Sequence, residues 1–173
     1  MYRPLVLFIA LVIAGCGAAH LRTDQSPTSA LPATAYIGRV SVTSQEEAAK
    51  TNSELQAKLR TWEVEARTRL QKGLTAKGYQ VVAEPPSPTD ATLTWNCDVD
   101  VKYGNRAMRY FVGFGAGSGH VNSTITAEDR VKETKYRSGA DSDLAMGGLG
   151  GDIGAVLDAN LDKLIGALPE PTR

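Results

Sequence analysis

The chain has 173 residues, and its 19 Lys and Arg residues balance 19 Asp and Glu residues, giving a formal net charge of zero. This length fits a single folded domain with an appended segment. The even charge balance argues against a nucleic-acid-binding protein, which needs a basic surface, and against a protein held on membranes by a polybasic patch.

The first sixteen residues have the organisation of a bacterial export signal. Arg3 gives a short positive region, and residues 5–14 form an apolar run that is too short to span a bilayer. Small residues then precede Cys16, and this pattern resembles the bacterial lipobox. The resemblance implies cleavage between Gly15 and Cys16 and attachment of acyl chains such as palmitate to Cys16. We therefore expect residues 1–15 to be a lipoprotein signal peptide, the alternative being an ordinary secretory signal with an incidental cysteine.

The segment after the predicted cleavage site indicates where the mature protein lies. Two or three acyl chains hold a protein firmly on a membrane, whereas one chain holds it only marginally. Gly17, rather than Asp, follows the cysteine; by resemblance to enterobacterial sorting, this favours the periplasmic face of the outer membrane. Residues 16–34 show no periodicity and are predicted to form the lipidated N-terminus and a flexible tether of about 20–25 Å. We interpret His20, within this tether, as inert.

A single periplasmic domain is predicted over residues 35–168, with a tail at 169–173. It opens with a short strand at 36–42. A long amphipathic helix follows, predicted to run from an N-cap at Ser44 to Gly78. Its apolar stripe recurs at steps of three or four residues: Leu55, Leu59, Trp62, Ala66, Leu70 and Leu74.

The later elements are predicted from strand-like alternation and a final apolar stripe. A strand returns at 79–84, the clearest strand covers 92–101, and a hairpin covers 120–127 and 131–138 before a terminal helix at 152–168. We expect an α+β fold, with a mixed sheet covered on one face by the long helix and the C-terminal helix. The opening strand-helix-strand unit should be parallel and the later strands antiparallel.

Three side chains in the strand at 92–101 could suggest a chemical site. Cys97 shares the apolar face of this strand, so we interpret it as a core residue and not as a redox or metal-binding thiol. Asp98 and Asp100 share the polar face and could hold a cation together. No third acidic or histidine ligand lies nearby in the sequence, so we interpret the pair as part of a solvated face.

Two glycine-rich segments, 109–119 and 146–154, flank the predicted hairpin. Neither contains G-x-G-x-x-G or a P-loop, so dinucleotide and phosphate binding are not indicated, although the start of the final helix could weakly bind an anion. Alternating glycines leave one face of a strand bare, which favours close packing or contact with a partner chain. The candidate contact residues are Arg109, Gly113, Gly115, Gly117, Gly119, Gly150 and Gly151.

The order of these features resembles that of a family of small uncharacterised Gram-negative lipoproteins. The resemblance covers roughly residues 35–168, and its most specific parts are a Val-Gly-Phe-Gly-Ala-Gly core and a later Gly-Gly-Asp element. Its domain is similar to envelope α/β modules such as the TolB amino-terminal domain and the curli-secretion lipoprotein. The resemblance implies no activity, and this sequence shows none of the additional membrane-spanning hairpins that a secretion pore uses.

The sequence does not indicate catalysis. It has no G-x-S-x-G elbow, and His120 has no base, metal-ligand or nucleophile partner at a recognisable spacing. We therefore expect a non-catalytic envelope lipoprotein without a cofactor or metal, acting through an envelope partner or through self-association and not through nucleic acid. The alternatives are a periplasmic carrier of lipid or small ligands, and an oligomeric component of a secretion apparatus.

Overall fold

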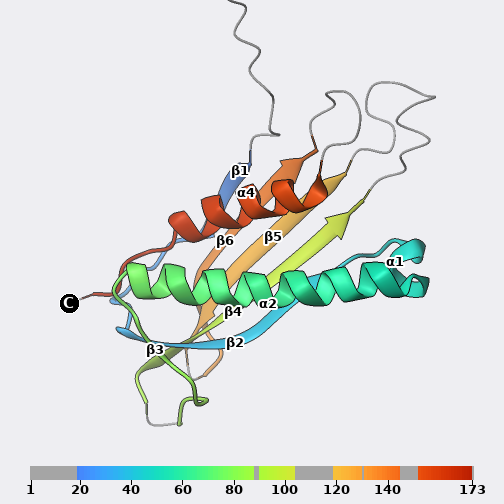
Figure 1. Cartoon of the computed structure of the whole chain (residues 1–173). Helices are drawn as coiled ribbons and strands as arrows, with labels where there is room; N and C mark the ends of the chain where they lie inside the picture. The colour runs from blue at the N-terminus through green and yellow to red at the C-terminus, as the bar shows by residue number, and fades with distance from the viewer. Residues whose placement is uncertain (1–18, 88–89, 104–118, 130, 145–151, 173) are drawn as a thin grey trace, which may run out of the picture.

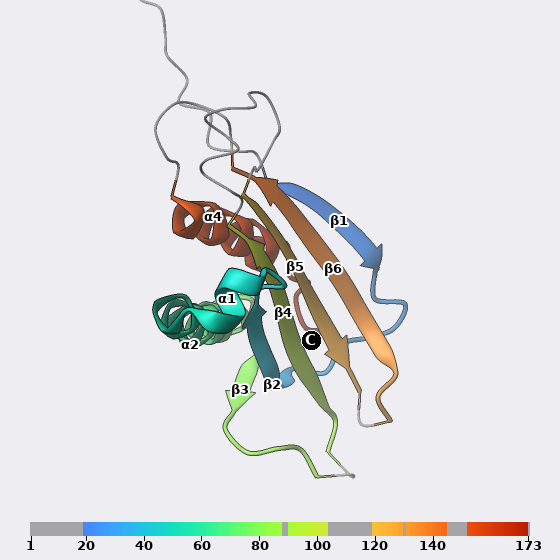
Figure 2. The ribbon, with the colours of Figure 1, turned by 90° about the vertical axis from the view of Figure 1, so that its right-hand side faces the viewer.

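The computed structural model describes residues 19–87, 90–103, 119–129, 131–144 and 152–172. One mixed sheet carries all the strands, and helices α2 and α4 lie side by side on one of its faces (Figures 1 and 2). The α+β prediction is therefore confirmed. The elements in chain order are β1 (His20–Gln25), β2 (Thr34–Thr43), α1 (Glu47–Thr51), α2 (Ser53–Ala76), β3 (Gln80–Val82), β4 (Thr92–Lys102), β5 (His120–Glu128), β6 (Thr134–Asp143) and α4 (Ile153–Gly166).

The six strands follow the order β1-β6-β5-β4-β2-β3. Strand β2 pairs in parallel with both β3 and β4. Strands β4, β5, β6 and β1 then pair antiparallel in turn. The predicted parallel opening unit and the predicted antiparallel later strands are both confirmed.

The core lies between the sheet and the two long helices. Each core-facing side chain of β4 is at most 2% exposed: Leu93, Trp95, Cys97, Val99 and Val101. Helix α2 covers this face with Trp62, Ala66, Leu70 and Leu74, as its apolar stripe predicted. Full burial of one large apolar side chain stabilises a fold by about 1.5–3 kcal/mol, so this interface is the main source of stability.

The structure confirms that Cys97 is a core residue. Its side chain is 1% exposed, and burial raises the pKa of its thiol to about 12. The thiol therefore stays protonated at neutral pH, and a protonated thiol is a poor nucleophile and metal ligand.

The long helix differs from its prediction at the N-terminal end. Instead of one helix capped by Ser44, the structure has the short α1 and then α2, which is capped by Asn52. The Asn52 Oδ1 atom accepts hydrogen bonds from the backbone N–H groups of Glu54 at 2.9 Å and Leu55 at 3.2 Å. An asparagine that bonds the first free N–H groups of a helix competes with helix continuation, so the chain turns at this point.

The predicted tether over residues 16–34 was wrong for residues 20–25, because these residues form β1 at one edge of the sheet. All six side chains of β1 are exposed, so the strand shows none of the apolar alternation that identifies a half-buried strand. The predicted tail also packs on the fold: the Thr172 Oγ1 atom accepts from the Leu31 N–H at 3.1 Å, and the Thr172 N–H donates to the Leu31 carbonyl at 3.0 Å.

Candidate assembly surface and anchored end

One end of the sheet gathers the chain segments that the sequence singled out. At this end, β1 begins at His20 opposite Asp141, and β4 ends at Lys102 opposite His120, where β5 begins (upper end in Figure 2). Both glycine-rich segments are therefore attached here, the first between β4 and β5 and the second between β6 and α4. We call this end the anchored end, because Ala19 lies only three residues after the predicted lipidation site.

Most predicted site residues lie outside the described residues: Gly15, Cys16, Arg109, Gly113, Gly115, Gly117, Gly150 and Gly151. Gly119 is described and is buried. A Cβ atom on Gly119 would lie 3.0 Å from the Ile153 Cδ1 atom and 3.3 Å from the Leu144 side chain. Gly119 is therefore closely packed against side chains of its own chain and is not an exposed contact.

No described helix covers the opposite face of the sheet (Figure 2), where β4 presents partly exposed polar side chains such as Thr94, Asn96 and Asp98. Asp98, predicted to lie on a solvated face, accepts a hydrogen bond from the Arg39 Nη2 atom at 2.7 Å. The neighbouring Asp100 has one buried carboxylate oxygen without a hydrogen-bond partner in the described part of the chain. No group of three or more His, Cys, Asp or Glu side chains in that part is arranged to hold a metal ion.

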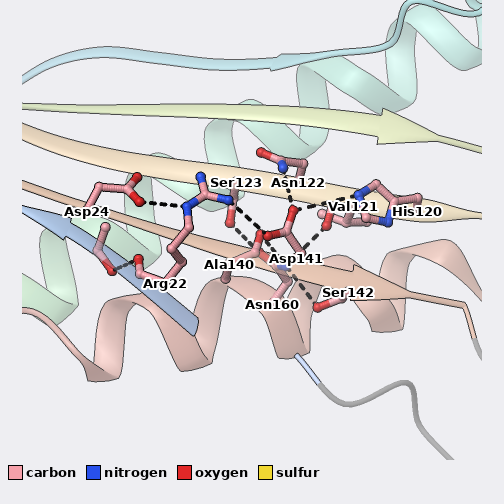
Figure 3. A network of polar contacts seen from close by, with 11 residues as sticks. Arg22, Asp24, His120, Val121, Asn122, Ser123, Ala140, Asp141, Ser142 and Asn160 are labelled. Carbon is pink, nitrogen blue, oxygen red and sulfur yellow. Dashed lines mark hydrogen bonds and ion pairs between the residues drawn. The ribbon is translucent and has the colours of Figure 1, made fainter. Parts of the chain in front are cut away.

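A polar network on this open face fastens β1 to the sheet (Figure 3). The Arg22 Nε atom donates to Asp24 at 2.7 Å, and its Nη1 atom donates to Asp141 on β6 at 3.4 Å. Asp141 also accepts from the Asn122 amide, and the His120 Nδ1 atom lies 2.8 Å from Asp143. Ion pairs this exposed contribute at most about 1 kcal/mol each, so the network positions β1 more than it stabilises the fold.

A second polar cluster is completely buried beneath α4, on the other face of β5 and β6 (Figure 3). Asn160 is 0% exposed, and its Oδ1 atom accepts a hydrogen bond from the Ser123 hydroxyl. Its Nδ2 atom donates to the Ala140 carbonyl at 3.0 Å, to Ser142 Oγ at 2.9 Å and to the Val121 carbonyl at 3.3 Å. Asn160 lies on the inner face of the terminal helix, and its bonds fix where α4 sits on the sheet.

The two edges of the sheet differ in how much of the edge is covered by other segments. Strand β1 forms one edge, and all six of its side chains are exposed, including Leu21 at 41%. At the other edge, β3 covers only residues 34–36 of β2, and Arg67 donates to the carbonyls of Ile37 at 3.2 Å and Gly38 at 2.7 Å. Beyond Arg67, no hydrogen bond among the described residues joins the outer backbone edge of residues 39–43 to another segment. We call β1 and residues 39–43 the two open edges.

Two surface depressions lie beside β2. The larger has a volume of about 520 Å³ and is lined by Thr34, Val82, Glu84, Pro85, Pro86, Asp90, Ala91 and Thr92. The smaller, of about 220 Å³, lies between Arg67 and Gln71 on α2 and the start of β2. Among the described residues, no helix is both long and apolar enough to cross a membrane.

Comparison with protein families and with curated proteins finds no match to the chain. Comparison with solved structures finds a shared fold. The PelC dodecamer from Paraburkholderia phytofirmans superposes with a TM-score of 0.50 at 13% sequence identity, over 89% of this chain and 99% of the PelC chain. A point variant of that dodecamer superposes with a TM-score of 0.47 at 12% identity, over the same shares of the two chains.

Proposed function

We propose that the chain is a lipid-anchored subunit on the periplasmic face of the bacterial outer membrane, which self-assembles and works through protein contacts without catalysis. The observation that carries this proposal is β1, an edge strand of exposed residues that begins four residues after the predicted lipidation site at Cys16. An uncovered edge strand offers a row of unpaired backbone groups to another strand, and proteins without a binding partner usually block such edges.

The fold comparison supports self-assembly as the form of those contacts. PelC, which shares the fold over nearly its whole chain, is a dodecamer. The same observation favours the oligomeric secretion-apparatus component among the alternatives, because such a component also requires self-association. The carrier alternative has less support, since charged side chains line both depressions beside β2: Glu84 and Asp90 the larger one, and Arg67 the smaller one.

The test is the mass of the full chain extracted from bacterial membranes in mild detergent, measured by light scattering with the detergent contribution subtracted. We expect the wild-type chain in the membrane fraction with a mass several times that of one protomer. The Cys16→Ser variant, which cannot accept acyl chains on its thiol, should leave the membrane fraction. A wild-type chain that stays monomeric across a hundredfold range of concentration would contradict self-assembly, and membrane retention of Cys16→Ser would contradict the lipid anchor.

A further inference from the structure

We propose that copies of the chain join head to tail, with β1 of one copy pairing antiparallel with residues 39–43 of β2 in the next copy. The contact would extend one six-stranded sheet into the next. This inference rests on the self-assembly proposed above and names the surface through which it occurs. Docking of a strand on an open sheet edge is a common mode of protein recognition.

Both open edges present backbone groups to solvent. The Arg22 carbonyl accepts a hydrogen bond from Ser138 on β6 at 3.0 Å, so it points inward. Because backbone groups alternate in direction along a strand, those of Leu21 and Thr23 point away from the sheet. On the opposite edge, the Arg39 N–H donates to the Asn96 side chain on β4 at 2.8 Å, and the outer groups of residues 40–43 lie past the two carbonyls that Arg67 occupies.

Strand direction favours this pairing over the symmetric one. Strand β4 runs parallel to β2, and the direction then reverses at each of the next three neighbours, β5, β6 and β1. Strand β1 therefore runs opposite to β2. If two copies both have their anchored ends at the membrane, β1 of one and β2 of the other therefore pair antiparallel. Antiparallel pairing of β1 with β1 would invert one copy and put its anchored end away from the membrane. The three residues from Cys16 to Ala19 span at most about 11 Å, which is too short to compensate.

The register of the sheet makes the two edges complementary. One row of paired residues crosses the whole sheet from Thr43 through Asp100, Asn122 and Asp141 to His20. Two copies standing at the same height on a membrane therefore place His20 of one opposite Thr43 of the other. Counting along the antiparallel strands from this pair puts two opposite charges, Asp24 and Arg39, opposite each other.

The same register matches the apolar side chains on the helix-covered face. Leu21, a large apolar side chain left 41% exposed, comes opposite Val42, which is buried on the same face of β2. The strand lengths also agree, because β1 has six residues and the open part of β2 has five. A contact between two different surfaces of the same chain is heterologous, and it closes into a ring when the rotation between copies allows it.

The contact is tested by disulfide crosslinking of the full chain in isolated membranes. The variant His20→Cys with Thr43→Cys places one thiol on each open edge, at two exposed positions, and gives up the 3.4 Å hydrogen bond from the Thr43 hydroxyl to the Val99 carbonyl. Mild oxidation should give a ladder of covalent multimers larger than dimers, which a reducing agent collapses to monomer. The parent chain, with its buried Cys97 and the predicted acylated Cys16, sets the background.

Three controls make the result specific. His20→Cys alone and Thr43→Cys alone should give no crosslinks above background. Thr43→Cys with Thr124→Cys, which moves one thiol to the middle strand β5 on the same open face, should give none either. Dimers from His20→Cys alone would overturn the proposal in favour of the symmetric β1 contact, and a ladder from the Thr124 control would reduce it to random collision.

Light scattering on the same samples separates this proposal from the function it rests on. Multimers without a ladder would overturn the β1–β2 contact and leave self-assembly standing, whereas monomers would overturn both. A second variant, Thr23→Pro, removes an N–H group that points away from β6, and edge strands tolerate proline at such positions. It should lower the multimer mass to that of one protomer with an unchanged circular dichroism spectrum; unchanged multimers would contradict the contact.

Discussion

The buried cluster around Asn160 predicts a large cost for a change that keeps the branched shape of the side chain but removes its hydrogen-bonding atoms. In Asn160→Leu, the hydroxyls of Ser123 and Ser142 lose a partner, although both side chains are at most 1% exposed. The Val121 and Ala140 carbonyls lose a donor as well. A buried polar group without a partner costs about 1–3 kcal/mol, and rotation of the two hydroxyls recovers part of this, so we expect a loss of about 2–4 kcal/mol.

The assay is urea unfolding of the full chain in detergent, followed by circular dichroism. For a domain of this size, a loss of 1 kcal/mol in the free energy of unfolding lowers the melting temperature by about 2–4 °C. The melting temperature of Asn160→Leu should therefore be lower than that of the wild type by roughly 4–16 °C. The matched control is Asp162→Asn, an exposed change on the same helix that weakens only an ion pair with Arg69 and should cost less than about 1 kcal/mol. Wild-type stability of Asn160→Leu would refute the conclusion that these bonds hold α4 in place.

Three further predictions concern packing, reactivity and edge order. A Cβ at Gly73 would lie 2.1 Å from a methyl carbon of Ile165 on α4, so Gly73→Ala should lower the free energy of unfolding by about 1–3 kcal/mol. A Cβ at Gly166 would have no atom within 4 Å, so the control Gly166→Ala should leave that free energy unchanged or raise it. Equal effects of the two variants in urea unfolding would contradict this prediction. Because its pKa is raised to about 12, the Cys97 thiol has little thiolate at pH 8 and should resist alkylation in the folded chain but react after unfolding, as mass spectrometry would show; rapid native labelling would refute it. Arg22→Ala should speed amide hydrogen exchange within β1 while changing global stability by less than about 1 kcal/mol, and unchanged exchange would show that the network does not fasten this strand.

The sequence was sufficient to predict elements whose side chains record burial. Strand β4 alternates apolar and polar residues without interruption, and the stripe of α2 repeats every three or four residues, so each element was identified from its own residues. Strand β1 escaped detection because backbone pairing and the Arg22 contacts hold it, with no buried side chain to mark it. The cap at Asn52 was missed because Ser44 carries an equally favourable capping side chain earlier in the chain.

The two open edges could not be predicted from the sequence, because no local pattern shows which strands lie at an edge. Whether a strand lies at an edge is decided by strand order, and β1 reaches its edge by pairing with β6, more than a hundred residues away. The glycines drew attention first because composition makes them conspicuous. The one described glycine among the predicted contact residues, Gly119, packs inside its own chain.

The position of β1 also determines how the domain would bear tension. If Cys16 holds the lipid, a pull on the domain enters at His20 and runs along the axis of β1, because the strand begins at the anchored end. The hydrogen bonds between β1 and β6 are then loaded together in shear instead of being opened one at a time, and Lys163, which binds the Ala19 carbonyl, shares the force at its point of entry. With two residues between Cys16 and Ala19, such an anchor would join the membrane to a mechanically resistant seam, which would suit a subunit that keeps its height and orientation under load.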